Sequence, residues 1–219
     1  FSLKASYILI PMDEDTQKNH LKAYGIAFWT LENDLTVDWL LNYRGGSFLI
    51  ENQTEIEKEC IVRGVSYEII TNAYKQQLQI ELVHPESNTD IIKLEKAPKV
   101  AVYSPEGNLP WDDAVTMVLT YSEIPYDIIY DEEILSDMLP MYDWIHLHHE
   151  DFTGQYGKFY ASFKNAPWYI EQKRNFEADA SKLGYSKVST QKLEVALKIK
   201  EFLAGGGFLF AMCSATDSY

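Results

Sequence analysis

Residues 205–213 read Gly-Gly-Gly-Phe-Leu-Phe-Ala-Met-Cys, a glycine run that leads directly into five consecutive apolar residues. A short apolar run bounded by turn residues is typical of a strand buried on both faces of a parallel sheet. Two earlier stretches, Val100–Tyr103 and Trp144–His148, have the same character. Helical patterns separate the strands, and Leu193–Leu203 stands immediately before the glycine run. The sequence therefore predicts an α/β fold built on a parallel sheet with right-handed crossovers.

The preceding part of the chain shows the same alternation of strand and helix signals. The expected strands are Tyr7–Ile10, Val37–Tyr43, Ser47–Ile50 and Tyr67–Thr71, and the expected helices are about 16–32, capped by Asp15 or Thr16, and 54–64, opened by a Thr54/Glu57 capping box. Residues 76–83 fit either a helix or a strand, and residues 84–98 fit a linker or an edge hairpin.

We predict two flavodoxin-like or amidotransferase-like α/β units, residues 1–97 and residues 98–219. A buried parallel strand is usually followed by a further helix, and the chain stops soon after one at Tyr219. We therefore expect the second unit to be truncated at its C-terminal end.

The overall charge excludes several functions. The 219 residues include 19 basic and 33 acidic side chains, for a net charge of −14. Nucleic-acid binding needs clustered Lys and Arg, so the charge argues against it and against binding to an anionic membrane. No apolar run approaches the roughly 18 residues of a spanning helix. Cys60 and Cys213 are the two cysteines in the sequence, too few for a disulfide framework.

Cys213 lies in a pattern that favours a nucleophile. Ala211 and Ala215 place small residues two positions on either side of it, as a tight strand-to-helix turn around a nucleophile requires. A following helix N-terminus would lower the pKa of the thiol and supply backbone N–H groups for an oxyanion. The alternative is a buried, unreactive cysteine at the end of a strand.

Residues 205–213, together with the strand at 142–148, resemble the class I glutamine amidotransferase-like superfamily, over roughly residues 99–219. The resemblance implies that Cys213 is the nucleophile acting on an amide. It also implies a ligand pocket formed by Ser214, His148, His149 and Glu150. In that superfamily a His and a Glu much later in the chain complete the triad. Ala215 replaces a glycine of the family and residues 148–151 replace its glycine-rich oxyanion loop, so degenerate catalysis stays open.

The whole chain also resembles a family of exported bacterial proteins often labelled asparagine synthetase B, on residues 17–25 and 39–48. An authentic synthetase has an N-terminal Cys and a Ser-Gly-Gly-x-Asp-Ser loop for ATP. This chain has Phe1, and Ser-Ala-Thr-Asp-Ser at residues 214–218. We interpret the label as a misassignment. Phe1 fits either a fragment boundary or removal of a signal peptide, so we expect export, with the cytoplasm as the alternative.

A second cluster could bind a divalent metal ion. Strand alternation places His146 and His148 on one face, and His149, Glu150 and Asp151 follow at the carboxyl end of the strand. Imidazole and carboxylate groups suit Zn²⁺ or a related ion, so His146, His148, His149 and Asp151 are candidate ligands of a metal-dependent hydrolase. The alternative is a polar strand end whose imidazoles are satisfied by hydrogen bonds.

Charge is unevenly distributed along the second unit. Residues 100–157 contain twelve acidic side chains and no Lys or Arg, whereas residues 158–200 contain nine Lys or Arg and four acidic side chains. The two stretches could pair within the chain. Alternatively, the acidic face 100–157, or the polar and aromatic excursion 151–189 with Trp168 and Tyr169, could bind a protein partner. The chain would then be a non-catalytic interaction module of a cell-envelope assembly.

Overall fold

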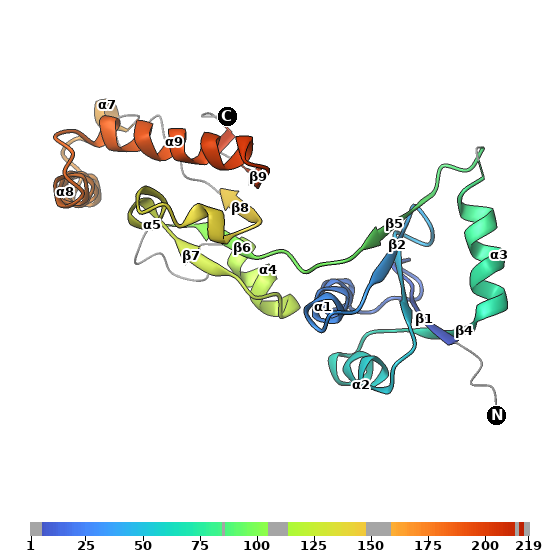
Figure 1. Ribbon diagram of the computed structural model, residues 1–219. Coiled ribbons are helices and arrows are strands. Elements are labelled where there is room, and N and C mark those ends of the chain that lie inside the picture. Colours follow the sequence, from blue (N-terminus) through green and yellow to red (C-terminus); the bar gives the residue numbers. More distant parts are fainter. Residues whose placement is uncertain (1–5, 85, 105–113, 148–158, 213–214, 217–219) are drawn as a thin grey trace. The chain divides into compact units, whose positions relative to one another are not determined.

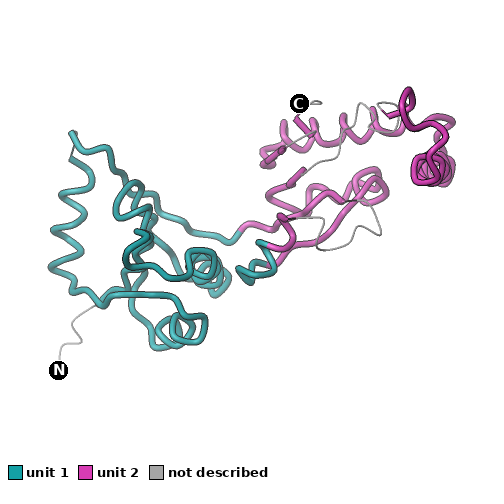
Figure 2. The backbone as a smooth tube through the Cα atoms, turned by 180° about the vertical axis from the view of Figure 1, so that it is seen from behind, with its two compact units in different colours: residues 1–97, 118–124 teal, residues 98–117, 125–219 magenta. Residues whose placement is uncertain are grey.

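The structure is a computed structural model that describes residues 6–84, 86–104, 114–147, 159–212 and 215–216. The chain forms two compact units (Figure 2): unit 1 comprises residues 1–97 and 118–124, and unit 2 comprises residues 98–117 and 125–219. The α/β character expected from the sequence is confirmed in both.

Unit 1 contains a mixed run of strands and helices. They are β1 (Ser6–Ile10), α1 (His20–Glu32), β2 (Val37–Leu41), β3 (Ser47–Glu51), α2 (Thr54–Arg63), β4 (Glu68–Thr71), α3 (Asn72–Leu82) and β5 (Asp90–Leu94). The strands lie in the order β4-β1-β3-β2-β5, and each neighbouring pair is antiparallel.

The prediction of a parallel sheet is therefore wrong for unit 1. Residues 42–46 join β2 to β3, and a parallel crossover needs a dozen or more residues. Helices α1 and α2 each connect two strands that point the same way, with an antiparallel strand between them. This is the split βαβ arrangement, to which α3 and β5 are added.

Strand alternation divides the core of unit 1 into two layers. Ile8, Ile10 and Phe48 face α1 and α2, whereas Leu9 and Leu49 face α3. Figure 1 shows the same division, with α1 and α2 on one side of the sheet and α3 on the other. Residues 76–83, ambiguous in the sequence, lie mainly in α3, where Leu78 and Leu82 complete the second layer.

Two predicted helix starts are wrong. The side chain of Asn19, not of Asp15 or Thr16, accepts the hydrogen bond at the start of α1. Thr54 is the first residue of α2 rather than its cap, because the extended residue Gln53 precedes the helix. Residues 84–98 contain the edge strand β5, which pairs with β2.

Unit 2 contains the second sheet. Its elements are β6 (Val100–Tyr103), the first part of α4 (Ala114–Ser122), β7 (Asp127–Ile129), α5 (Asp131–Leu135), the 3₁₀ helix η2 (Leu139–Met141), β8 (Trp144–Leu147), α7 (Tyr160–Phe163), α8 (Pro167–Lys182), α9 (Val188–Ala204) and β9 (Phe208–Ala211). The described strands lie in the order β7-β6-β8-β9 and are all parallel, as the sequence predicts for this half of the chain.

One face of this sheet packs against α5 and α9. Tyr103, Ile145 and Leu147 from the strands meet Ile134 of α5 and Ile199 of α9 in a single apolar cluster. In Figure 1 helix α9 extends along this face. In the part of the chain that the structure describes, no helix has the length and apolar character needed to cross a bilayer.

We expect the turn at residues 42–46 to be sensitive to a single methyl group. Gly45 has φ +80°, and a Cβ there would lie 2.3 Å from the carbonyl oxygen of Met12. Gly45→Ala should therefore lower the free energy of unfolding by about 2–4 kcal/mol, from left-handed strain plus the clash. Urea denaturation would measure the loss.

Gly64→Ala is the matched control. Gly64 also has a positive φ, +67°, but a Cβ there meets nothing within 4 Å. We expect the free energy of unfolding of this variant to fall by about 1 kcal/mol, the cost of the left-handed backbone conformation alone. Equal losses in the two variants would show that the close approach to Met12 contributes nothing to stability.

Candidate functional site

The strand order of unit 2 identifies one edge of the sheet as the candidate site. Numbered by their order in the chain, the strands of this sheet lie 2-1-3-4. The connection that leaves β6 runs toward β7 and the connection that leaves β8 runs the other way toward β9, so the strand order reverses between β6 and β8. Open parallel sheets bind ligands at such a switch point, outside the carboxyl ends of the strands. Tyr103 pairs with Leu147, and Leu147 with Ala211, so β6, β8 and β9 end level with one another.

Most of the predicted site residues lie outside the described residues. These are Cys213, Ser214, His148, His149, Glu150 and Asp151. Their neighbours in the chain are described: Leu147 ends β8, and Met212 follows β9. The backbone N–H of Met212 donates to the carbonyl oxygen of Leu147 at 2.9 Å, so the two segments leave the sheet from adjacent strands.

The residues on either side of Cys213 are tied to each other. The N–H of Ala215 donates to the carbonyl oxygen of Met212 at 3.1 Å, a hydrogen bond between residues three apart in sequence. Ala215 is fully buried in the apolar cluster of unit 2. A larger residue at position 215 would have to displace core side chains, which accounts for a small residue there.

His146 is the one predicted metal ligand within the described residues. Its ring is buried and stacks on Phe210 of β9, with centroids 5.4 Å apart and planes 16° from parallel. Trp144 meets it edge-on at 6.2 Å. Within the described residues no three His, Cys, Asp or Glu side chains could together hold a metal ion.

Sequence reasoning missed a buried polar cluster at the same edge. Asp131, the first residue of α5, lies just beyond β7, and Tyr103 is the last residue of β6. Lys192, near the start of α9, donates to Asp131 Oδ2 at 2.7 Å, to the Tyr103 hydroxyl at 2.9 Å and to the Tyr130 hydroxyl at 3.0 Å. Its side chain is 9% exposed and that of Asp131 is 3% exposed.

The cluster is internally satisfied. Asp131 also accepts from the Tyr103 hydroxyl at 2.6 Å and from Gln191 Nε2 at 2.8 Å, while Lys192 lies over the ring of Tyr130 at 4.4 Å. The Nζ of Lys192 donates to three acceptors, so it is fully engaged in hydrogen bonds and is not a free nucleophile. The cluster joins the ends of β6 and β7 to α9. Its hydrogen bonds hold these three elements in fixed positions relative to one another.

Helix α9 shows why this cluster was missed. The sequence predicts an apolar face framed by Leu193, Leu197 and Ile199/Lys200. Ile199 is buried, but Leu193 and Leu197 are exposed, at 59% and 41%. The face turned to the core instead includes Gln191, Lys192 and Val195. Two features of the sequence could have indicated the cluster. Gln191 and Lys192 interrupt the apolar stripe of the helix, and Asp131 follows closely after a strand.

Ion pairs connect the acidic and basic stretches of unit 2. Lys182 contacts Glu132 at 2.5 Å, and Lys198 contacts Asp137 at 2.7 Å. With Lys192 and Asp131, these pairs join α8 and α9 to α5 and the residues after it. The interpretation that the two stretches pair within the chain is thus confirmed for these residues.

The described part of the excursion 151–189 contains an aromatic cluster. The rings of Phe159, Phe163, Trp168 and Tyr169 form a chain of contacts with centroids 5.3–6.0 Å apart. Tyr169 is buried, as a core residue would be, whereas Phe163 and Trp168 are exposed at 43% and 47%.

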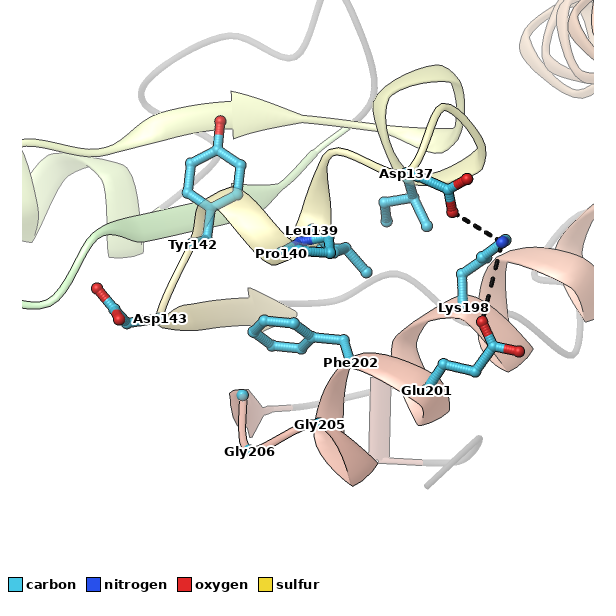
Figure 3. A pocket seen from close by; sticks show the side chains of 12 residues that line it. Asp137, Leu139, Pro140, Tyr142, Asp143, Lys198, Glu201, Phe202, Gly205 and Gly206 are labelled. Atoms are coloured by element: carbon cyan, nitrogen blue, oxygen red, sulfur yellow. Dashed lines mark hydrogen bonds and ion pairs between the residues drawn. The ribbon is translucent and has the colours of Figure 1, made fainter.

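An open pocket lies at the opposite end of the sheet. It is lined by residues just before β8, including Tyr142 and Asp143, and by Gly205–Gly207 just before β9 (Figure 3). It is therefore at the amino ends of these strands, away from the edge where the predicted catalytic residues follow β8 and β9. Comparison with protein-family models, curated proteins and solved structures finds no match to this chain.

We expect the Lys192 cluster to dominate the stability of unit 2. Lys192→Met leaves Asp131 buried without its cation, which should cost about 3–5 kcal/mol. Lys182→Met, which removes an exposed ion pair with Glu132, should cost less than about 1 kcal/mol. Chemical denaturation followed by near-ultraviolet circular dichroism would measure both.

A second substitution separates charge from packing. In the double variant Lys192→Met/Asp131→Asn no buried charge is left uncompensated, so part of the lost stability should return. The variant Asp131→Asn is measured alone as well. If the loss of stability in the double variant equals the sum of the losses in the two single variants, Lys192 and Asp131 are not coupled.

Proposed function

We propose that unit 2 is a class I glutamine amidotransferase-like domain of an exported bacterial protein, which acts on an amide through Cys213. The observation that carries the proposal is the level carboxyl edge of β6, β8 and β9. The segments that bear His148 and Cys213 leave adjacent strands at this edge, joined by the hydrogen bond from Met212 to Leu147. An open parallel sheet binds its ligand at this edge.

The reaction follows from thiolate chemistry. The sulfur of Cys213 attacks the amide carbonyl carbon, a C–S bond forms and the carbonyl oxygen becomes an oxyanion. The C–N bond then breaks, and the nitrogen takes a proton and leaves as ammonia or an amine. Water attacks the thioester, which releases the carboxylate and restores the thiol. In this proposal Ser214, His148, His149 and Glu150 line the substrate pocket.

The buried cluster supports such a site indirectly. Lys192 and Asp131 join α9 to the ends of β6 and β7. Those strand ends form part of the edge where the substrate would bind. A reacting group must be held to within a fraction of an ångström, and a fully satisfied buried network supplies that rigidity.

Thiol reactivity tests the nucleophile directly. Cys60 is fully buried, and burial raises its pKa to about 12, so it contributes almost no thiolate at neutral pH. We expect iodoacetamide at pH 7 to alkylate one cysteine, Cys213, faster than it alkylates a free thiol such as glutathione. Mass spectrometry of the digested protein would assign the site and the rate.

Two variants serve as controls for the alkylation experiment. Cys60→Ala should keep the fast reaction, and Cys213→Ala should abolish it. A Cys213 that reacts no faster than glutathione would rule out an activated nucleophile. Because burial raises the pKa of Cys60 to about 12, Cys60 should stay unlabelled in the folded protein at pH 9 and should react only when the protein unfolds.

A second candidate function is partner binding through the aromatic cluster of Phe159, Phe163, Trp168 and Tyr169. Exposed Trp and Phe side chains in mutual contact are typical of the centre of an interface. This function would use unit 2 as a non-catalytic module, and it needs no reactive cysteine.

Site-specific photo-cross-linking tests this second candidate. A photoreactive residue in place of Trp168 should cross-link a defined partner in the cell of origin. The same residue in place of Asn175, exposed on the same helix α8, should not. Equal cross-linking at the two positions, or none at either, would argue against an interface at the aromatic cluster.

A further inference from the structure

The pocket at the amino ends of β8 and β9 has the size of a small-molecule site. Its volume is about 400 Å³, and small-molecule sites occupy roughly 300–1,000 Å³. Figure 3 shows its walls, formed by η2 and the residues just before β8 on one side and by the last turn of α9 and its glycines on the other. All of these residues belong to unit 2.

The floor of the pocket is apolar. Ile134 and Leu139 are buried, and the ring of Phe202 is 9% exposed. A Cβ on Gly207 would lie 2.2–2.4 Å from atoms of this ring, so the glycine lets Phe202 lie directly against the backbone. Phe202 therefore adds to the apolar floor, with most of its ring covered by the backbone at Gly207 and a small part of its surface left for a ligand.

The walls carry an excess of negative charge. Asp137, Asp143 and Glu201 line the pocket with a single lysine, Lys198, for a sum of 1 − 3 = −2. Lys198 lies 2.7 Å from Asp137 and 3.8 Å from Glu201. The hydrogen bond to Asp137 raises the pKa of Lys198, which therefore stays protonated, and it neutralises only part of the wall charge.

Helix α9 adds to this negative potential. The helix has 17 residues and ends at the pocket, where Gly205 is its C-cap. The last carbonyl groups of a helix carry a partial negative charge that favours cations. The carboxylates and the C-terminal end of α9 thus both make the electrostatic potential in the pocket more negative.

We propose that this pocket binds a small organic cation with an apolar or aromatic body. The ammonium or guanidinium group would lie beside the carboxylates of Glu201 and Asp137, which face each other across Lys198 (Figure 3), and the body would contact Phe202 and Leu139. The negative potential disfavours an anion, and no group of described side chains could hold a metal ion. The site lies at the opposite strand ends from the proposed active site and does not depend on it.

Binding of benzylammonium to the full chain, measured by isothermal titration calorimetry, tests the proposal. Benzyl alcohol, a neutral molecule of nearly the same shape, is the ligand control. Glu201→Gln should weaken benzylammonium binding roughly two- to fivefold, the effect of one partly exposed charge pair. Lys198→Met removes a repelling cation and should strengthen binding by a similar factor.

Lys200→Met is the matched protein control, since Lys200 is exposed on α9 and does not line the pocket. It should leave the affinity within about twofold. Opposite shifts in Glu201→Gln and Lys198→Met, with unchanged circular dichroism, would support the proposal. Equal affinity for benzyl alcohol, no saturable binding up to millimolar ligand, or shifts of the same sign in both variants would overturn it.

Discussion

The buried contact between Lys192 and Asp131 is the constraint on which the second sheet depends. Two opposite charges, both almost fully withdrawn from water, are tolerated only if every remaining hydrogen-bonding group also finds a partner. Tyr103, Tyr130 and Gln191 supply those partners. The requirement fixes where α9 starts relative to β6 and β7, because a helix shifted by one residue would leave the ammonium without its acceptors.

The sequence predicts where strands lie more reliably than it predicts whether neighbouring strands are parallel or antiparallel. Apolar runs predicted the strands of both units, but the same kind of run can lie in a parallel or an antiparallel sheet. In unit 2 helices separate the strands, and the sheet is parallel. In unit 1 the short link at residues 42–46 forces β2 and β3 into a hairpin, and β1 lies between β3 and β4. The length of the connection between two strands could have indicated whether they pair in a parallel or an antiparallel sheet.

For the candidate site, the sequence predicted the strands that precede it. The level register of Tyr103, Leu147 and Ala211 places the ends of β6, β8 and β9 at one edge, and the predicted site residues that follow β8 and β9 stay a prediction. The polar cluster was not predictable from single residues, because a lysine in a helix is usually solvated and only its tertiary partners allow burial. Likewise, Leu193 and Leu197 have the spacing of a core face, but the side of α9 that packs inward carries Val195, Ile199 and Phe202 together with Gln191 and Lys192.

A parallel sheet with antiparallel helices separates charge between its two ends. Each crossover helix returns against the strand direction, so its positive N-terminus lies near the carboxyl edge and its negative C-terminus near the amino edge. Helix α9 follows this rule: Lys192, near its start, reaches Asp131 beyond β7, and Phe202, near its end, lines the pocket before β8. The carboxyl edge therefore suits a reaction that develops an oxyanion, and the amino edge suits a bound cation. The two proposed sites, one that develops an oxyanion and one that binds a cation, agree in their electrostatic preference with this direction of the helices.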